Sequence, residues 1–236
     1  MADSTRPTVT VVIPVHNEAS FLPGALPRLF DELETVDANI SVLVVENGST
    51  DRTADLVRDV MPTYRNLRLL ELPTPDYGAA MREGFLRADT AWVANFDIDY
   101  FSASFLNDAL VLADSADIVL ASKRVEGADD RRSSIRRFAT WMFNQILRFV
   151  LSSGVSDTHG MKLVRKTVVD DIVPHVISST DLFDTELVVR AERAGYRISE
   201  LPASVEELRE SKSNLVKRVP RTVSGVWKIR RSFRDS

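Results

Sequence analysis

The sequence predicts an α/β fold in which a doubly wound, mainly parallel sheet is flanked by helices and followed by a basic amphipathic tail. Apolar, β-branched runs alternate with segments of helical periodicity from residue 8 to about residue 121. The chain has 236 residues, of which 44% are hydrophobic, which is enough for one sizeable core. We therefore expect one domain over residues 1–210, with halves at 1–121 and 122–210, and a separate C-terminal segment at 211–236.

Five apolar runs are the candidate strands, because strands buried on both faces of a parallel sheet are nearly continuous in apolar residues. They are residues 8–15, 40–45, 67–72, 91–96 and 117–121. Apolar residues at helical spacing lie between them, over residues 21–33, 54–60, 79–86 and 105–112. Ligands of such sheets bind outside the carboxyl ends of the strands, so the residues that follow each run are the candidates for function.

The regular alternation stops after residue 121. A charged loop follows, then a predicted helix over about 134–152, a predicted hairpin around 155–165 and a predicted helix over about 184–194. This second half of the chain is expected to supply contacts to a second substrate.

The C-terminal tail is strongly basic. Residues 212–234 contain eight Lys or Arg and no acidic residue, although the whole chain has a net charge of −4. Apolar residues recur in the tail at helical spacing, at Leu215, Val219, Val223, Val226 and Trp227. Two alternatives stay open: the tail packs on the acidic body, or it lies on an anionic membrane surface.

Composition excludes some chemistry. The chain has no cysteine, which excludes disulfides, thiolate metal sites and thiol nucleophiles. The N-terminus has no apolar signal region, and the apolar stretch at 138–151 is interrupted by polar residues. We expect a cytoplasmic protein without membrane spans, with peripheral membrane contact through the tail as an alternative. We expect no nucleic-acid partner, and a homo-oligomer stays open.

The segment FDIDYF at 96–101 is the strongest chemical signal. Asp97 and Asp99 follow an apolar strand directly, and strand alternation points Ile98 the other way. Paired carboxylates suit Mg²⁺ or Mn²⁺, which also take phosphate oxygens and can stabilise a departing diphosphate. The alternative interpretation is a pair of solvated turn or capping carboxylates.

Polar residues also follow the first three strands. Pro14, His16, Asn17 and Glu18 follow the first, and Glu46 and Asn47 follow the second, where they could hold a base or ribose. Gly78 and Arg82 follow the third, and the planar Arg82 fork could meet a diphosphate. Turn formation for the first loop and an exposed salt bridge for Arg82 are the alternatives.

These segments together resemble family 2 glycosyltransferases, in particular the branch of dolichyl- or polyprenyl-phosphate sugar synthases and their bacterial relatives. The segments occur in the family's order along most of the chain: VVIPVHNEA, VVENGSTDRT, YGAAMREGF, FDIDYF, ASKRV, SDTHGMKLVRK, FDTELVVRAERAGYRISELP and SKSNL. The resemblance implies the GT-A fold, a nucleotide-sugar-binding half at 1–121 and an acceptor half at 122–210. It also implies a nucleoside-diphosphate sugar as donor and an inverting mechanism.

The resemblance also implies residue roles. Asp97 and Asp99 would hold the metal, and the nucleotide would be surrounded by Pro14, His16, Asn17, Glu18 and Glu46. Lys123 and Lys162 would offer cations to phosphates, as would Arg124, Arg131, Arg132, Arg136 and Arg137. The sequence departs from the family at Phe101, where many relatives carry a glutamine, and it lacks the Gln-x-x-Arg-Trp segment of processive members. Polymer synthesis is therefore disfavoured.

A catalytic base is needed only if the acceptor is a hydroxyl, because an acceptor phosphate is already ionised. The candidates are Asp157, His159, Asp184 and Glu186, besides the metal-binding Asp99. Their structural alternatives are a turn cap for Asp157, a loop histidine for His159, a helix N-cap for Asp184 and a surface helix position for Glu186.

Two other function classes stay open. One is a phosphatase or phosphomutase with Asp97 as nucleophile and Asp99 as acid/base, although three strand–helix units precede the motif and Phe101 replaces a small polar residue. The other is a degenerate transferase that only binds its ligand, which Glu46, Asn47 and Phe101 keep open. A nicotinamide or flavin enzyme is disfavoured, because no Gly-x-Gly-x-x-Gly follows a strand.

Overall fold

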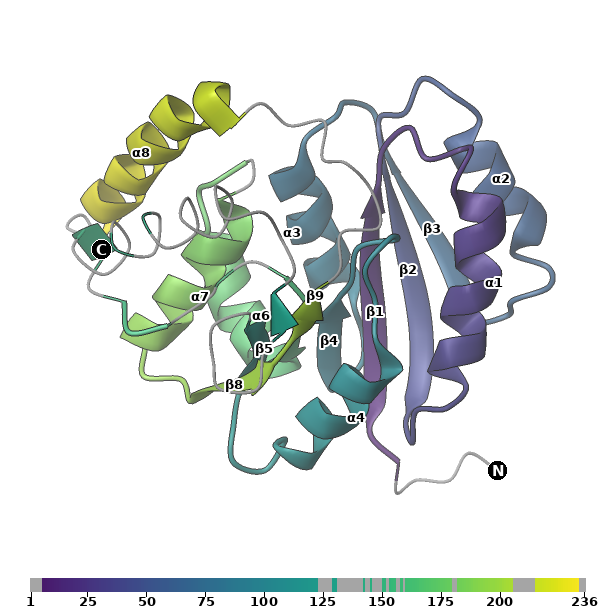
Figure 1. Ribbon diagram of the computed structural model, residues 1–236, viewed down its shortest axis with the longest axis horizontal. Coiled ribbons are helices and arrows are strands. Elements are labelled where there is room, and N and C mark those ends of the chain that lie inside the picture. The colour runs from purple at the N-terminus through teal and green to yellow at the C-terminus, as the bar shows by residue number, and fades with distance from the viewer. Residues whose placement is uncertain are drawn as a thin grey trace.

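A seven-stranded sheet forms the centre of the molecule, with helices on both of its faces (Figure 1). The computed structural model describes residues 6–122, 129–130, 142, 145, 150–151, 153–155, 158, 160–179, 182–205 and 215–233. Most of the helix predicted over 134–152 lies outside these residues. The predicted α/β class with a mainly parallel sheet is confirmed.

The five predicted strands all form. They are β1 (Thr8–Val15), β2 (Asn39–Asn47), β3 (Leu67–Leu72), β4 (Trp92–Asn95) and β5 (Ile118–Ser122), and β7 (Lys162–Arg165) and β8 (Ile198–Pro202) complete the sheet. The strand order is β3-β2-β1-β4-β7-β5-β8, and only β7 runs antiparallel to its neighbours. A second, two-stranded sheet pairs β6 (Asp129–Asp130) with β9 (Ser204–Val205).

The hairpin predicted around 155–165 is wrong. Among the described residues of this range, only Lys162–Arg165 forms a strand, and it pairs with β4 on one side and β5 on the other. Lys162 lies opposite both Asn95 and Leu120. A local sequence pattern can indicate pairing only between segments that are neighbours in the chain. The partners of β7 are β4 and β5, which lie much earlier in the chain, so the local pattern could not indicate them.

Among the described residues, three helices pack against each face of the sheet. One face packs against α1 (Leu22–Leu33), α2 (Thr53–Val60) and α4 (Ala103–Val111), and the other against α3 (Tyr77–Arg87), α6 (Lys166–Ile172) and α7 (Phe183–Arg193). A single 3₁₀ turn, η1 (Val173–His175), follows α6. The four helices predicted in the first half and the one predicted at 184–194 are confirmed to within a few residues.

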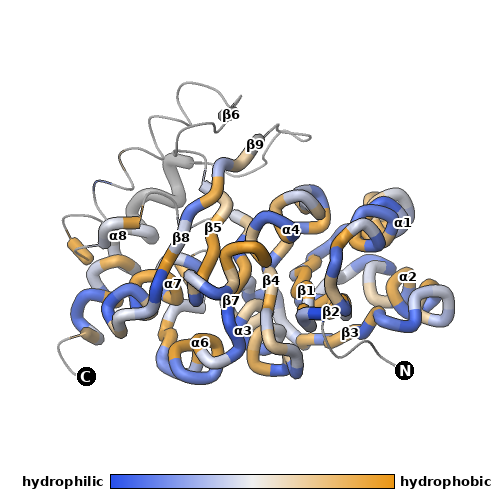
Figure 2. The backbone as a smooth tube through the Cα atoms, turned by 90° about the horizontal axis from the view of Figure 1, so that it is seen from below, coloured by the Kyte–Doolittle hydropathy of each residue, from blue (hydrophilic) through white to orange (hydrophobic). Residues whose placement is uncertain are grey.

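Side-chain alternation along β1 builds both cores. Val11 and Ile13 belong to the cluster beneath α1, whereas Val12, between them, belongs to the cluster beneath α3. Figure 2 shows the result from below: hydrophobic residues dominate β4 and β5, while α1 alternates between hydrophobic and hydrophilic residues. The sheet is therefore buried on both faces, as expected for strands with continuous apolar sequence.

The tail forms α8 (Leu215–Ser232), which packs on the outside of α7. Val226 and Ile229 are fully buried against Leu182 and Val189. Gly225 allows this approach, since a Cβ there would collide with the Leu182 side chain. Trp227, which shares the apolar spacing of the tail, is 57% exposed. Among the described helices, none is long and apolar enough to cross a bilayer.

Candidate active site

The polar segments after β1, β2 and β4 meet at one edge of the sheet. These strands are adjacent and parallel, so their carboxyl ends lie side by side. The strand order reverses between β1 and β4, because β2 and β3 lie on one side of β1 and the later strands on the other. A crevice at such a switch point is the usual ligand site of an open parallel sheet.

The loops after β1 and β2 are joined by hydrogen bonds. His16 Nδ1 lies 2.8 Å from the carbonyl oxygen of Asn47, and Asn17 N–H donates to Ser49 Oγ at 2.9 Å. Asn17 Oδ1 accepts from the backbone N–H of Thr50 at 2.8 Å. Asn17 adopts φ 55°, a left-handed conformation that asparagine tolerates better than most residues. The first loop is thus held in place by the second.

A second set of bonds fixes the start of α2 against the same loop. Glu18 N–H donates to Thr53 Oγ1 at 2.9 Å, and Ala19 N–H donates to Asp51 at 3.1 Å. Asp51 also accepts from the Thr53 hydroxyl and from its backbone N–H. The hydrogen bond from the Thr53 hydroxyl is the main reason why the pKa of Asp51 lies below its ordinary value.

Glu46 and Asn47 have structural roles that the sequence did not reveal. Both are buried. The Glu46 carboxylate accepts from the backbone N–H of Ser49, and Asn47 Oδ1 accepts from the backbone N–H of Asp76 at 2.7 Å. Asp76 in turn caps α3 by accepting from Ala79 N–H at 3.0 Å. Asn47 therefore connects the end of β2 to the beginning of α3.

Gly48 makes the turn after β2 possible. Its φ is 62°, and a Cβ would lie 2.7 Å from the backbone nitrogen of Pro75 and 2.7 Å from the carbonyl carbon of Thr74. Any larger residue would therefore meet both backbone strain and a steric clash. The tight approach brings the loops before α2 and α3 together at the sheet edge.

The structure gives Arg82 a different role from the predicted diphosphate contact. Its guanidinium donates to the carbonyl oxygens of Val173 and Val176, around η1. It thereby ties α3 to the segment that follows α6, and we remove it from the residues assigned to phosphates. Gly78 is buried in the first turn of α3, and its N–H donates to the carbonyl of Ser179 at 3.2 Å.

Asp97 and Asp99 stand where the metal hypothesis needs them. Both come just after β4; Asp97 is exposed, Asp99 is half-buried, and Ile98 between them is buried, as predicted. Backbone hydrogen bonds between Asp97 and Tyr100 close a tight turn that carries the two carboxylates. Phe101 is half-buried against the core beneath α1. Within the described part of the chain, no cluster of three or more acidic or histidine side chains could enclose a metal.

Lys162 is buried in an ion pair, which corrects its prediction as a phosphate contact. Its side chain has no exposure, and its ammonium donates to Asn95 Oδ1 at 2.9 Å, the Gly160 carbonyl at 2.8 Å and Asp184 Oδ1 at 2.8 Å. An ammonium has three donors, so these bonds use all of them. Tyr77 OH donates to the other Asp184 oxygen at 2.8 Å.

Asp184 and Glu186, two of the candidate bases, differ from the structural alternative considered for each. Asp184 is not an N-cap, since Leu182 precedes the helix and Asp184 is buried two positions later. Glu186 is fully buried rather than a surface residue: its carboxylate accepts from the backbone N–H groups of Ile177 and Ser178 and from the Arg190 side chain. The carboxylate oxygens of both residues are buried and hydrogen-bonded. Neither carboxylate is therefore positioned as a solvent-accessible base.

Sequence reasoning missed Tyr77 and Asn95, which complete the buried network around Lys162. The available signal was Asn95, a polar residue that ends an otherwise apolar strand two positions before Asp97.

Several predicted residues lie outside the described part of the chain: Lys123, Arg124, Arg131, Arg132, Arg136, Arg137, Asp157 and His159.

Comparison with known proteins now identifies the family. The model of "Glycosyl transferase family 2" matches residues 10–173, a range that contains the loops after β1 and β2 and the Asp97–Asp99 pair. The chain belongs to glycosyl transferase family 2. An uncharacterized glycosyltransferase of Mycobacterium bovis is 30% identical to this family 2 glycosyltransferase over 197 residues, covering 83% of this chain and 84% of the relative. A dolichyl-phosphate beta-glucosyltransferase of Trichomonas vaginalis is 27% identical over 248 residues, covering 94% and 76%.

Solved structures show the same fold. A mannosyltransferase from Pyrobaculum calidifontis, in complex with GDP-Man and Mn²⁺, aligns with a TM-score of 0.65 at 22% identity. The alignment covers 92% of this chain but 61% of that one, so this glycosyltransferase spans less than two thirds of its length. Glucosyl-3-phosphoglycerate synthase from Mycobacterium tuberculosis, in complex with Mn²⁺, UDP and glucosyl-3-phosphoglycerate, aligns with a TM-score of 0.64 at 17% identity, covering 96% of this chain and 79% of that one. The fold of the chain is therefore of the GT-A type.

Proposed function

We propose that this glycosyltransferase moves a sugar, with inversion at the anomeric carbon, from a nucleoside-diphosphate sugar to an acceptor, with the help of a divalent metal. The observation that carries the proposal is the position of Asp97 and Asp99. The two carboxylates follow β4 at the switch point of the sheet, next to the connected loops after β1 and β2. A donor held by these loops would present its diphosphate to the carboxylates.

Asp97 and Asp99 would supply part of the ligand set of a bound Mn²⁺ or Mg²⁺. Two carboxylates supply hard oxygen ligands, and such metals usually complete their shell with waters and substrate phosphate oxygens. The bound metal would neutralise the charge that develops on the departing diphosphate.

The connected loops form the proposed nucleotide platform. Pro14, His16, Asn17 and Glu18 supply one side of it, and Glu46 and Asn47 supply the other. The hydrogen bonds from His16 and Asn17 to the second loop hold the platform before a ligand arrives, which reduces the ordering cost of binding. Gly78 lies in the first turn of α3, which Asn47 anchors through Asp76.

Inversion requires the acceptor to attack the face of the sugar opposite the diphosphate. An acceptor phosphate is already ionised, so residues of the acceptor half need only orient it. A hydroxyl acceptor would need a base, for which Asp157 and His159 remain the proposed candidates.

We assign Asp184 instead to positioning, because Lys162 neutralises it and Tyr77 donates to it. The phosphate contacts proposed for Lys162 are withdrawn, and those of Lys123 are retained.

The first experiment is a thermal-shift screen with UDP, GDP, TDP and CDP, each with and without Mn²⁺. Ligands that bind the native state raise the melting temperature. We expect one nucleotide to give a metal-dependent shift, which the variant Asp97→Asn with Asp99→Asn loses. The matched control is Asp108→Asn with Asp114→Asn, which changes charge equally at exposed positions away from the sheet edge. Absence of any shift in the wild type would contradict the donor site.

We further propose a polyprenyl phosphate as acceptor. The support is the Trichomonas vaginalis relative, a dolichyl-phosphate beta-glucosyltransferase whose match covers 94% of this chain. Incubation with a radiolabelled donor and polyprenyl phosphate should move label into the organic phase. Label that stays in water-soluble products when small hydroxyl acceptors are supplied would contradict the lipid acceptor but not the transfer activity. Donor binding without transfer to any acceptor would favour a degenerate binding module.

A further inference from the structure

Helix α8 has two chemically different faces. Val226 and Ile229 are fully buried against α7, and Arg190 on α7 donates to Ser232 Oγ at 2.8 Å. Ser224, Trp227, Lys228 and Arg231 are exposed. These four residues have the spacing i, i+3, i+4 and i+7, so they share one face of the helix. The helix is thus fixed on the body by one face and presents the other to solvent.

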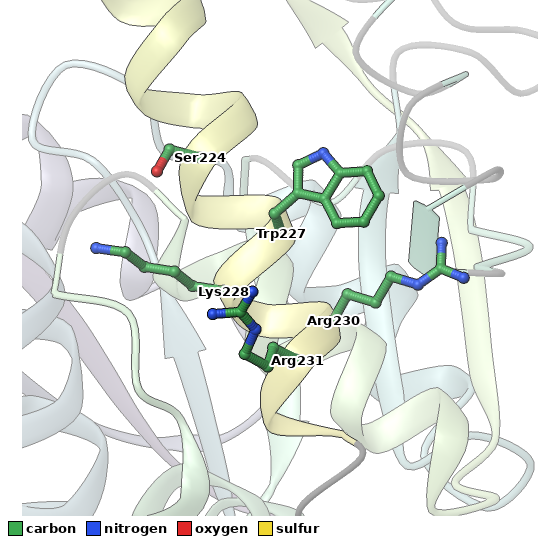
Figure 3. Close-up of a pocket in the computed structure, with 5 residues that line it drawn as sticks. All are labelled: Ser224, Trp227, Lys228, Arg230 and Arg231. Carbon is green, nitrogen blue, oxygen red and sulfur yellow. The ribbon is translucent and has the colours of Figure 1, made fainter.

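The outward face combines cations with one aromatic ring. It borders a pocket of about 460 Å³ whose described lining residues are Ser224, Trp227, Lys228, Arg230 and Arg231 (Figure 3). The Arg230 guanidinium lies 5.6 Å from the centre of the Trp227 ring, and Figure 3 shows both side chains projecting from the same side of the helix. None of these five residues is acidic, and residues 212–234 contain none either.

We propose that the outward face of α8 docks this glycosyltransferase on the surface of an anionic lipid bilayer. An exposed tryptophan prefers the boundary between headgroups and acyl chains, because its ring is apolar and its N–H is polar. Lysine and arginine beside it attract anionic headgroups, an interaction that is favourable only near the surface and weakens with salt. The charge of this face is complementary to anionic lipid, and the helix is already folded against α7.

Docking on the body and binding to a membrane are therefore compatible. The inner face of α8 packs on the body, and the outer face is available to bind a membrane. In Figure 1, α8 lies at the end of the molecule opposite α1 and α2. A bilayer bound to the outward face would consequently leave those two helices away from the lipid.

Cosedimentation with large vesicles tests the proposal without donor or acceptor, so its result is separate from that of the transferase assay. We expect binding to vesicles that contain phosphatidylglycerol, weak binding to pure phosphatidylcholine, and a decrease at high salt. Lys228→Glu with Arg231→Glu should reduce the partition coefficient at least about tenfold, given the contribution of each basic residue near an anionic surface. Trp227 fluorescence should shift to the blue on binding, and Trp227→Phe should lose that shift.

The matched control is Arg52→Glu with Arg65→Glu, which makes the same charge change at exposed positions at the α2 end of the molecule. Circular dichroism and melting temperature verify that each variant is folded. Equal loss of binding in the control, or equal binding to neutral and anionic vesicles, overturns the proposal. Release from vesicles by millimolar inorganic phosphate would also overturn the proposal, because it would indicate a site for free phosphate. A preference for RNA over anionic vesicles at equal salt would overturn it as well.

Discussion

At the scale of single residues, the buried pair of Lys162 and Asp184 carries the most information about how the two halves of the chain meet. Lys162 lies on β7 and Asp184 on α7, whereas their partners Asn95 and Tyr77 lie on β4 and α3. A buried charge is tolerated only when it is paired and hydrogen-bonded. The network therefore connects the second half of the chain to the strand that ends just before Asp97.

Lys162→Met should lower the free energy of unfolding by about 3–5 kcal/mol, because it leaves the Asp184 carboxylate buried without its cation. Urea unfolding measures the effect. The double variant Lys162→Met with Asp184→Asn should regain part of the loss, since it removes both charges. Lys166→Met is the matched control: its ion pair with Asp170 is partly exposed, so the cost should stay below about 1 kcal/mol. Equal costs for the two lysines would contradict the role of Lys162.

Gly48→Ala should destabilise the protein by at least about 2 kcal/mol, because alanine is strained at φ 62° and its Cβ would collide with the backbone of Thr74 and Pro75. The same substitution at Gly24 is the control, since no atom lies within 4 Å of its Cβ position and the site is inside α1. Gly24→Ala should be neutral or stabilising by up to about 1 kcal/mol. Thermal unfolding of both variants distinguishes a required turn from a general preference for glycine.

The sequence predicted which loops meet at the site, but not which side chains contact one another there. Asp97, Ile98 and Asp99 have the predicted exposure, although they lie in the tight turn between Asp97 and Tyr100 rather than in the strand itself. Arg82 was assigned to a diphosphate by residue type and Lys162 to phosphates by the family resemblance. Arg82 instead donates to a carbonyl far away in the chain, and Lys162 is paired with Asp184. Charge alone does not indicate whether a long side chain reaches solvent or a buried partner.

At the scale of elements, Asp117 joins three strands at one edge of the sheet. It lies just before β5, and its carboxylate accepts from Arg165 on β7 and from Arg197 just before β8. Hydrogen bonding to the Arg197 side chain is the main reason why the pKa of Asp117 falls from 3.8 to about 2. The ionised carboxylate thus stabilises the junction of β5, β7 and β8.

This shift predicts how stability depends on pH. Because the folded-state pKa is below the unfolded value, the contribution of Asp117 is present above about pH 4 and is lost as pH falls towards 2. Asp117→Asn should cost about 1–2 kcal/mol at pH 7, a figure that allows for solvent around Arg197, and the difference from wild type should shrink towards pH 2. Asp114→Asn, at an exposed position three residues earlier, should show no such pH-dependent difference.

Most elements of the first half could be predicted because each carries its own local pattern. The run at 8–15 coincides with β1, and the run at 67–72 coincides with β3. In the second half, α7 is buried at seven consecutive positions from Phe183 to Val189, because the sheet covers one side and α8 the other. A helix enclosed in this way has no polar face for a sequence pattern to reveal. The pattern therefore did not indicate that Glu186, a candidate base with a surface position as its structural alternative, is buried.

At the scale of the whole molecule, α8 is both part of the core and part of the surface. Its inner residues complete a third apolar cluster with Leu151, Leu182 and Val189. The sequence indicated amphipathicity but could not decide the direction of the polar face, since the partner surface on α7 comes from a distant segment. Trp227, which shares the apolar spacing of the tail, lies on the exposed side of the helix.

The two faces should respond differently to truncation. Ile229→Ala should lower the free energy of unfolding by about 2–4 kcal/mol, because Ile229 is fully buried and its removal leaves a cavity. Trp227→Ala should change it by less than about 0.5 kcal/mol, because the side chain is 57% exposed. Chemical denaturation provides both values. A larger cost for Trp227 than for Ile229 would contradict the assignment of the inner face.

The insertion of β7 between β4 and β5 has a consequence for synthesis on the ribosome. One edge of β4, which ends at Asn95, has no partner until Lys162–Arg165 has been translated and has left the exit tunnel. During that interval the nascent chain exposes an apolar strand edge, which is prone to pair with other chains. A chain terminated near residue 121 should therefore aggregate rather than accumulate as a folded half, and chaperones that bind extended apolar segments should engage the nascent protein during this period.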